Sequence, residues 1–390
     1  MTIELLSGNA AVEAASDSDF AGTINPRQYR VSDRLAERAT TMLSEAFGNR
    51  WGADVRLAEA FSTSDFTLAA AKELDSEMLA QYQELPTTWD QYTDTTTVRD
   101  FRPKRLKSRG HGKIGMARVP ELTEYPADTT KGAKEYAIQV AKYGRRKAIS
   151  WEAWLNNEAV QELEDLPGEL ARQARETEMI AAVSNLLLIS NDSLLKGEAT
   201  ATDVNTNFFK SANSNAPDNK ALTFDNLKTV LDGMATKKDP VTKRVIARPD
   251  VVVVIPKALE ATMISIVNTV QIRVTDSSTD TEFIQNNPLA GVSYVVEPML
   301  DTVNAHTKAA GTWFVVPKPG GPRPALWVAH LAGHEAPDLR VKADTGRRVG
   351  GGEISALEGS FDIDDIQYRG RHIVGNQTAD ALFTYCSYGS

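Results

Sequence analysis

The chain has 390 residues, 42% of them hydrophobic, which is enough for two or three domains that fold without metals or disulfides. Its only cysteine, Cys386, excludes an intrachain disulfide, and we expect a buried, unreactive thiol. No stretch reaches the ~20 apolar residues of a membrane span. The N-terminus lacks the basic and apolar regions of a signal peptide. We therefore expect a soluble protein that folds in a reducing cytosol.

Charge is distributed unevenly along the chain. Residues 1–100 contain 8 Lys or Arg and 17 Asp or Glu, whereas residues 101–148 contain 13 and 4, and residues 149–390 contain 22 and 31. The net charges of these three segments are therefore −9, +9 and −9. The basic block is either a solvated face, a nucleic-acid contact, or an arm that binds the acidic surface of a neighbouring subunit.

The first 94 residues predict an N-terminal helical arm. Residues 1–30 are small and polar, which indicates an extended leader. Apolar residues at helical spacing predict one helix from Ser32 to Gly48 and a second from Ser64 to Leu85, which Pro86 ends. This arm is either retained or a scaffold-like segment that is cleaved.

Residues 95–150 predict an extended β-hairpin. Thr95 to Val98 are β-formers, and residues 135–150 alternate at first between the two faces of a strand. The excursion between them is basic and contains glycines at 110, 112 and 115. Because a two-stranded ribbon is marginal alone in water, we expect it to contact something else.

The rest of the chain predicts two further lobes. Residues 151–222 should hold a long helix, with Pro167 in its first turn and an end near Ser190 to Asp192, followed by a loop at 197–220. Residues 223–334 predict an α/β lobe with helices that begin at Thr223 and Pro256. Its expected strands are 251–255, 292–296, 313–316 and 325–329. Residues 335–390 should return as strands around Phe361, Ile363, Ile366 and Ala381–Tyr385.

No catalytic or metal-binding motif is convincing. His330 and His334 are four residues apart, but a strand running into a loop does not bring such residues together, and the glutamate of a zincin motif is missing. Gly350 to Gly352 do not match a phosphate-binding loop. Asp362, Asp364 and Asp365 are explained as the wet side of a strand. We therefore expect no enzyme, no cofactor and no metal.

Residues 95–190 resemble the extended loop and long spine helix of tailed-bacteriophage major capsid proteins, which have the Hong Kong 97-type fold. The resemblance rests on a basic, glycine-interrupted hairpin that ends in KYGRRKAISWEAWLNNEAV, residues 142–160. The 223–334 lobe is similar to the axial domain of this family. Residues 368–385, with Arg369, Arg371 and Asn376, are similar to its last peripheral-domain strands. The implied fold is α+β, with segments at 1–94, 95–150, 151–222, 223–334 and 335–390.

The resemblance implies a structural role. Family members form hexamers and pentamers of an icosahedral shell around phage double-stranded DNA, and their extended loops lie across neighbouring subunits. The implied partners are copies of the chain, a portal, scaffold or decoration proteins, and DNA held without sequence specificity, but no membrane. The implied location is the virion, assembled in the cytoplasm of a bacterial host.

The predicted site is the cationic surface of the extended loop, which would contact a neighbouring subunit. It comprises Arg102, Lys104, Arg105, Lys107, Arg109, Lys113, Arg118, Lys131 and Lys134. Some family members crosslink a loop lysine to a peripheral-domain asparagine, and Lys131 and Lys134 are the candidate lysines here. The expected acceptor strand, residues 360–370, contains no asparagine.

Three other functions compete with a phage shell. An encapsulin-type nanocompartment would share the fold, but a long N-terminal arm favours a phage protein. A soluble metal-dependent hydrolase would depend on His330 and His334. A DNA-binding module at residues 102–118 is disfavoured because that segment lacks interleaved aromatic residues and the chain is acidic.

Overall fold

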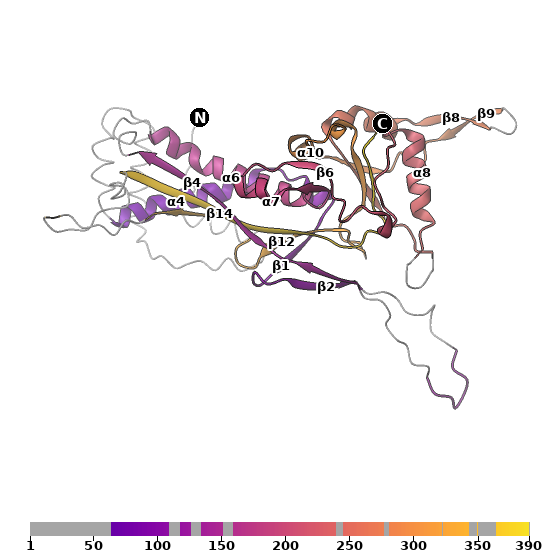
Figure 1. Ribbon diagram of the computed structural model, residues 1–390, viewed down its shortest axis with the longest axis horizontal. Helices are drawn as coiled ribbons and strands as arrows, with labels where there is room; N and C mark the ends of the chain where they lie inside the picture. Colours follow the sequence, from indigo (N-terminus) through magenta and orange to yellow (C-terminus); the bar gives the residue numbers. More distant parts are fainter. Residues whose placement is uncertain are drawn as a thin grey trace. The chain divides into compact units, whose positions relative to one another are not determined.

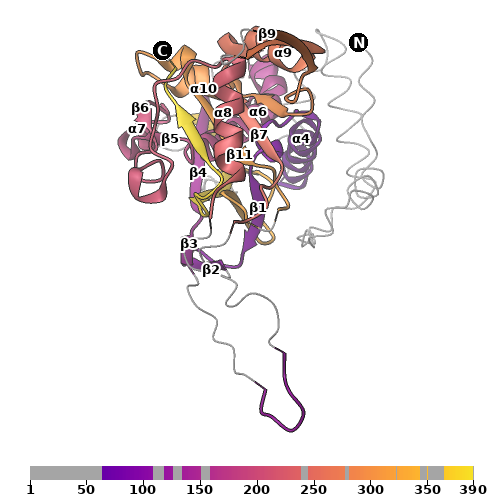
Figure 2. The same ribbon diagram turned by 90° about the vertical axis from the view of Figure 1, so that its right-hand side faces the viewer.

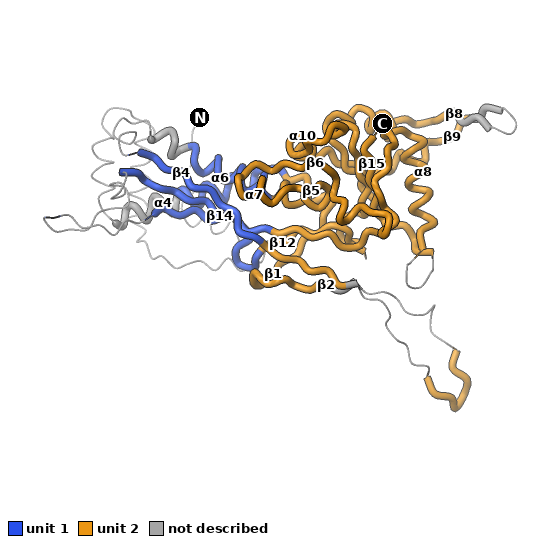
Figure 3. The backbone as a smooth tube through the Cα atoms, viewed as in Figure 1, with its two compact units in different colours: residues 1–86, 141–177, 331–374 blue, residues 87–140, 178–330, 375–390 orange. Residues whose placement is uncertain are grey.

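The computed structural model describes residues 64–108, 118–125, 134–150, 159–238, 245–276, 281–321, 323–342, 349 and 364–389. The predicted helix from Ser32 to Gly48 lies outside these residues. Figure 3 shows two compact units. Unit 1 contains residues 1–86, 141–177 and 331–374, and unit 2 contains residues 87–140, 178–330 and 375–390. Helices and strands are mixed in the chain, which confirms the α+β class, while the five predicted segment boundaries stay predictions.

Among the described residues of unit 1, two long helices supply the helical part. Helix α4 spans Ser64–Glu84, as predicted, and Pro86 follows it. Helix α6 spans Ala159–Val183, and its residues up to 177 belong to unit 1. Pro167 lies inside α6, so the prediction that it starts the helix is wrong. Leu166, Leu170 and Ala171 are buried on either side of it, so tertiary packing outweighs the local cost of the proline. No helix in the described ranges qualifies as a membrane span.

Among the described residues of unit 1, three antiparallel strands pair in one sheet. Strand β14 (Asp365–Thr378) pairs with β4 (Ala141–Ser150) on one side and with β13 (Asp338–Val341) on the other, and Figure 1 labels two of them, β4 and β14. Residues 135–150, predicted as one return strand, are therefore two strands, and the second leaves the hairpin to pair with β14. The prediction placed strands near Ile366 but missed a strand as long as β14.

One face of this sheet is covered by the two helices. A Cβ on Gly370 of β14 would meet the Leu170 side chain of α6, and Lys147 of β4 pairs with Glu169 of α6 at 3.1 Å. Helix α4 contacts β13, where the Asp75 carboxylate accepts a hydrogen bond from the Leu339 amide at 3.2 Å. Because side chains alternate along a strand, the residues on either side of these contacts point to the opposite face of the sheet.

The extended loop begins in unit 2. After the short 3-10 helix η1 (Trp89–Gln91) come β1 (Asp94–Val98), β2 (Lys104–Ser108) and β3 (Lys134–Ile138). Strands β2 and β3 pair in antiparallel register, from Lys104 opposite Ile138 to Ser108 opposite Lys134. The predicted hairpin therefore exists, but β2 is its outgoing strand and not Thr95 to Val98.

A small strand–helix–strand segment of unit 2 replaces part of the predicted helix and loop. Strand β5 (Leu187–Ile189) pairs with β6 (Ala201–Val204), and the short helix α7 (Asn191–Lys196) connects them. The predicted end of the long helix near Ser190 is therefore wrong. The run Leu186 to Ile189 is apolar throughout, and such a run does not distinguish a helix from a buried strand. The 3-10 helix η2 (Ser211–Asn213) follows.

A four-stranded sheet forms the core of the rest of unit 2, in the order β10-β7-β11-β15. Strand β7 (Val251–Ile255) pairs in parallel with β10 (Ser293–Val296) and antiparallel with β11 (Trp313–Pro317). Strand β15 (Tyr385–Ser387) pairs with the other edge of β11 and carries the buried Cys386. Every residue of β7 and β11 is buried, as the continuous apolar run of β7 predicted.

Helices α8 (Phe224–Ala235) and α9 (Glu260–Asn268) pack on this sheet (Figure 2). Both were predicted, and the predicted cap of α8 is present, since the Thr223 hydroxyl accepts from the Asn226 amide. The 3-10 helix η3 (Lys257–Leu259) precedes α9. Trp313 and Phe383 lie in the shared core, and the Trp313 indole donates to the Lys220 carbonyl at 2.9 Å.

The remaining elements of unit 2 connect these strands. Strands β8 (Gln271–Asp276) and β9 (Thr281–Asn286) form a hairpin that the prediction missed, although Ile272 and Val274 alternate with polar residues in β8. Helix α10 (Pro298–Val303) and the 3-10 helix η4 (Ala309–Gly311) lead into β11. Strand β12 (Leu326–Leu331) lies where a strand was predicted at 325–329.

Candidate intersubunit surfaces

The base of the extended loop is a two-stranded ribbon with cations on its surface. The Lys104 ammonium donates to the Thr97 carbonyl at 2.8 Å, and Arg105 pairs with Glu135 across the ribbon at 3.3 Å. The Arg105 and Glu135 side chains are 75% and 44% exposed, so this pair contributes at most about 1 kcal/mol. The cations of the ribbon are therefore only weakly compensated within their own chain.

The structure places four of the nine predicted site residues with their side chains or exposure described. Arg102, Lys104, Arg105 and Arg118 are exposed. Lys107 and Lys134 lie on β2 and β3, where their register is described but their side chains are not. Arg109, Lys113 and Lys131 lie outside the described residues, so the candidate crosslink lysines stay predictions. The structure thus brings together Lys104, Arg105, Lys107 and Lys134 on one ribbon.

The loop is anchored at its root. Ile138 and Val140 are buried, and the Gln139 amide donates to the Phe101 carbonyl at 3.0 Å. A Cβ on Gly375 would collide with the backbone of Gln139 and would lie 2.8 Å from the Val140 Cα. Only glycine therefore allows these two backbone segments of the same chain to approach so closely. The ribbon therefore leaves unit 2 from a tightly packed base.

A second contact at the root involves Tyr136. Burial raises the pKa of the Tyr136 phenol to about 12, with a further increase from the negative charge of Asp380. Asp380 pairs with Arg323 at 3.0 Å, and both side chains are at most one-fifth exposed. Asp380 also accepts the Leu382 amide, so the charges that Tyr136 of β3 senses are held in the C-terminal segment and by Arg323. Sequence reasoning missed these residues because they are distant in the chain.

Residues 118–125 of the loop contain a formed turn that is acidic. The Thr123 hydroxyl donates to the Pro120 carbonyl at 2.6 Å. Leu122, between them, has a φ of 60° and is fully exposed, and Tyr125 is 82% exposed. Glu121 and Glu124 are exposed as well. A left-handed leucine and two exposed apolar side chains are costly in water, which indicates a surface that becomes covered.

The sheet of unit 1 carries a row of arginines on the face away from α4 and α6. Arg369 of β14 lies directly opposite Arg146 of β4 on one side and Arg340 of β13 on the other. Arg146 and Arg369 are exposed, and the Arg340 side chain is 36% exposed. We call Arg146, Arg369 and Arg340 the arginine row. The sequence predicts a strand through residues 135–150, but it does not show the register that aligns the three arginines.

Little negative charge compensates this row among the described residues. Asp338 accepts from Arg340 at 2.8 Å and from Arg371 at 2.6 Å, so one carboxylate serves two guanidiniums. Arg146 donates to the neutral Gln367 side chain at 3.2 Å. Within the described ranges, Arg369 has no ion pair. This face of unit 1 is therefore strongly cationic.

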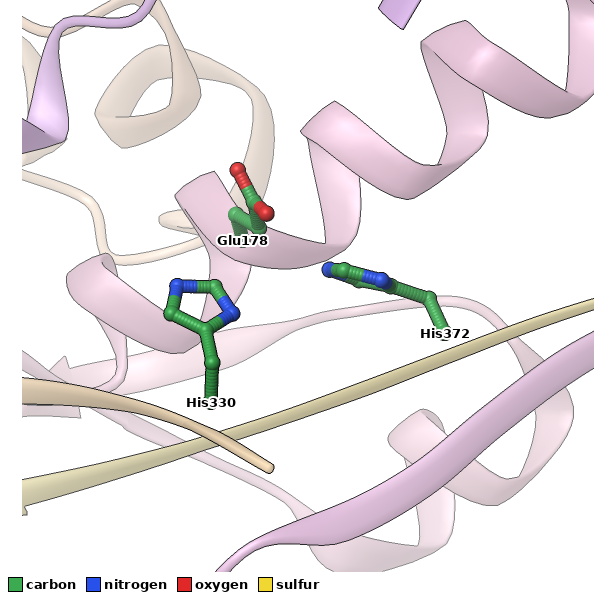
Figure 4. Close-up of side chains that lie close together, drawn as sticks. All are labelled: Glu178, His330 and His372. Atoms are coloured by element: carbon green, nitrogen blue, oxygen red, sulfur yellow. The ribbon is translucent and has the colours of Figure 1, made fainter. Parts of the chain in front are cut away.

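His330 and His334, where the sequence predicted no zinc site, lie on different kinds of structure. His330 lies on β12, and His334 is exposed after a turn, so the two do not share a helix face. Figure 4 draws His330 with Glu178 of α6 and His372 of β14. Glu178 and His330 belong to unit 2, and their potential ligand atoms lie within 4.8 Å, whereas His372 belongs to unit 1. Of these three residues, unit 2 supplies Glu178 and His330, and Glu178 is fully buried.

Comparison with protein families decides the class of protein. A family model described as "Phage capsid protein" matches residues 134–386, which is well over half of the chain. The chain belongs to the phage capsid protein family. The match begins at β3 and ends in β15, so it includes β4, β14 and β13 with the arginine row. The resemblance noted from the sequence is therefore confirmed at the level of the family.

Solved structures similar to this capsid protein are distant in sequence. A chain of Gordonia phage Cozz is 13% identical with a TM-score of 0.45, over 76% of this chain and 84% of that chain. A chain from the capsid of an empty GTA particle is 12% identical with a TM-score of 0.45, over 78% and 90%. A virus-like particle from Pyrococcus furiosus is 9% identical with a TM-score of 0.41, over 81% and 98%. No curated protein sequence matches this chain.

Proposed function

We propose that this protein is the major subunit of the head of a tailed bacteriophage. In this proposal, copies of the chain form hexamers and pentamers of an icosahedral shell with the Hong Kong 97-type fold, which encloses double-stranded DNA. The protein has no enzymatic role and is located in the virion after assembly in the cytoplasm of the host. The observation that carries the proposal is the match of the phage capsid family to residues 134–386.

The surfaces of the subunit support self-assembly. The β2–β3 ribbon pairs with no further strand among the described residues, and a lone two-stranded ribbon is marginal in water. Its exposed cations, Arg102, Lys104 and Arg105, would be compensated by acidic surface on a neighbouring copy. Each such contact is weak and sensitive to salt, but a shell repeats it many times.

Further partners belong to the same proposal. A shell that packages DNA needs a portal, and scaffold or decoration proteins are compatible with it. DNA would be held without sequence specificity, because a chain with a net charge of −9 disfavours tight binding to a polyanion. Crosslinking through Lys131 or Lys134 would appear as covalent ladders that survive boiling in detergent.

Electron microscopy of the purified chain tests the proposal. Negative-stain images, with light scattering to measure mass, should show closed shells or isolated capsomers. A monomer at all concentrations and salt conditions would overturn it. Shells that contain cargo protein and never DNA, even when assembled in infected cells, would favour a nanocompartment over a phage head.

A charge-reversal variant tests the role of the ribbon. Arg102→Glu with Lys104→Glu and Arg105→Glu should prevent assembly while the dissociated subunit still unfolds cooperatively. The matched control reverses three exposed lysines elsewhere in unit 2, Lys196, Lys210 and Lys308, and should assemble. Normal shells from the ribbon variant would show that the cations of β2 do not hold neighbours together.

A further inference from the structure

The arginine row is an unfavourable arrangement for an isolated subunit. Like charges directly opposite on neighbouring strands destabilise a sheet. Arg340, Arg369 and Arg146 occupy three adjacent strands, and neighbouring strands lie about 4.8 Å apart, so the row spans about 10 Å. A local arrangement that costs stability without a partner in the fold indicates a functional surface. An anion bound to the row would offset the repulsion between the arginines.

Guanidinium groups in such a row are suited to carboxylates. Each presents a planar fork of donors that can bind one carboxylate through two hydrogen bonds. Asp338, beside the row, already accepts one hydrogen bond from Arg340 and one from Arg371, both at the same carboxylate oxygen. Arg369 and Arg146, at the middle and the end of the row, keep exposed donors and have no carboxylate partner among the described residues.

The turn of the extended loop carries matching groups. Glu121 and Glu124 are exposed and three residues apart, so their carboxylates can lie up to about 10 Å from each other. The Pro120–Thr123 turn fixes the backbone between them and would lower the entropy lost on docking. Leu122 and Tyr125, both exposed, add apolar area that would be covered in the same contact.

We propose that the acidic turn at residues 120–125 of one copy docks on the arginine row of a second copy. Glu121 and Glu124 bind Arg369 and Arg146, and Leu122 and Tyr125 pack beside them. This inference rests on the proposed function, because it needs neighbouring copies of the chain. It adds that the loop bears two groups of opposite charge, cations on its base and carboxylates at its turn. The base and the turn would therefore bind different surfaces of neighbouring copies.

Two other anions compete for the row. The first 26 residues contain four acidic residues and no Lys or Arg, and DNA is a polyanion of high charge density. The acidic turn is favoured because its two glutamates are exposed in the structure and can reach two neighbouring arginines, Arg369 and Arg146, at the same time. Both alternatives give a different outcome in the test below.

A reciprocal charge swap tests the contact. The row variant carries Arg146→Glu and Arg369→Glu, the turn variant carries Glu121→Arg and Glu124→Arg, and the swap variant carries all four. The row variant and the turn variant should each lower the yield of shells at least about tenfold, because the weakened contact is repeated throughout the shell. The swap variant should recover most of the yield, since it restores opposite charges between copies.

Matched controls reverse the same number of charges elsewhere. Arg172→Glu with Lys210→Glu corresponds to the row variant, and Glu198→Arg with Asp232→Arg to the turn variant; all four residues are exposed. Circular dichroism of dissociated subunits verifies folding. If the wild type forms no shells, the proposed function fails. If it does, and the turn variant assembles normally or the swap variant recovers nothing, the contact proposed here is wrong and the row binds another anion.

Discussion

The Tyr92 phenol donates a hydrogen bond to the Glu297 carboxylate at 3.1 Å, although Tyr92 is 1% exposed and Glu297 is fully buried. The Thr88 hydroxyl donates to the same oxygen, and the other oxygen accepts the Met299 amide at the start of α10. The carboxylate thereby joins the segment that precedes the extended loop to the strand-and-helix core of unit 2.

Replacing Glu297 by alanine should destabilise the subunit. The substitution leaves the buried Tyr92 hydroxyl and the half-buried Thr88 hydroxyl without this acceptor, and a buried polar group without a partner costs about 1–3 kcal/mol. We expect the free energy of unfolding of the dissociated subunit to fall by about 3 kcal/mol in urea titrations. Glu198→Ala, at an exposed position of unit 2, is the control for loss of one negative charge. An unchanged stability of Glu297→Ala would show that water replaces the carboxylate.

Glu297 should also make stability depend on pH. Burial raises the pKa of its carboxyl, against the lowering effect of its three hydrogen bonds. A group whose pKa is raised on folding contributes stability below its unfolded pKa, here 4.5, and loses it as the pH rises through the folded value. The wild type should therefore lose stability relative to Glu297→Gln from pH 4.5 upward. Parallel stability curves for the two proteins would contradict this.

The sequence predicted the elements whose pattern is local. The β-branched run of β7, the cap and apolar face of α8, and the end of α4 before Pro86 all follow from neighbouring residues. They were placed correctly because burial on both faces, capping and proline each leave a short-range signal.

The sequence did not predict the features that depend on pairing. Residues 135–150 divide between two strands because β4 finds β14, more than 200 residues away in the chain, and no local pattern encodes that partner. The arginine row has the same origin, since its three members come from three segments that are far apart in the chain. The basic character of the loop was clear from composition, whereas its acidic turn was hidden inside a segment with a net charge of +9.

Cys386 should be unreactive in the folded subunit. Its side chain is fully buried on β15, and burial raises the pKa of the thiol, so very little thiolate forms. Iodoacetamide should label it only after denaturation, and because the chain has one cysteine, mass spectrometry reports this site alone. Rapid labelling at neutral pH without denaturant would show that β15 opens readily.

Arg175 should hold α4 on α6 through geometry that lysine cannot reproduce. Its guanidinium lies 3.7 Å from the centre of the Tyr82 ring, and its Nε donates to the Tyr82 carbonyl at 2.9 Å. Arg175→Lys keeps the charge but loses the planar stacking, so we expect a loss of about 1–2 kcal/mol in the stability of unit 1. The exposed Arg172→Lys on the same helix should change stability by less than about 0.5 kcal/mol. Equal effects of the two would exclude a specific role for Tyr82.

Two glycines should respond in opposite directions to alanine. At Gly375 a Cβ would enter the backbone of Gln139 and lie 2.8 Å from the Val140 Cα, and neither neighbour can yield because both belong to the packed root of the extended loop. Gly375→Ala should therefore cost several kcal/mol or prevent folding. Gly233, inside α8, has nothing within 4 Å of its Cβ position, and Gly233→Ala should raise the free energy of unfolding by about 0.5–1 kcal/mol through helix propensity.

Thermal unfolding of both glycine variants tests whether the root of the extended loop, where Gln139 and Val140 pack against Gly375, is firmly held. If Gly375→Ala unfolds at the wild-type temperature, the β3 and β14 segments separate at little cost, and the ribbon would be free to reorient. If it is destabilised and the loop becomes sensitive to protease at residues 101–140, the root is what holds the ribbon in place. That second result is the one we expect, because a shell contact at the end of a loop transmits force only when the base of the loop is fixed.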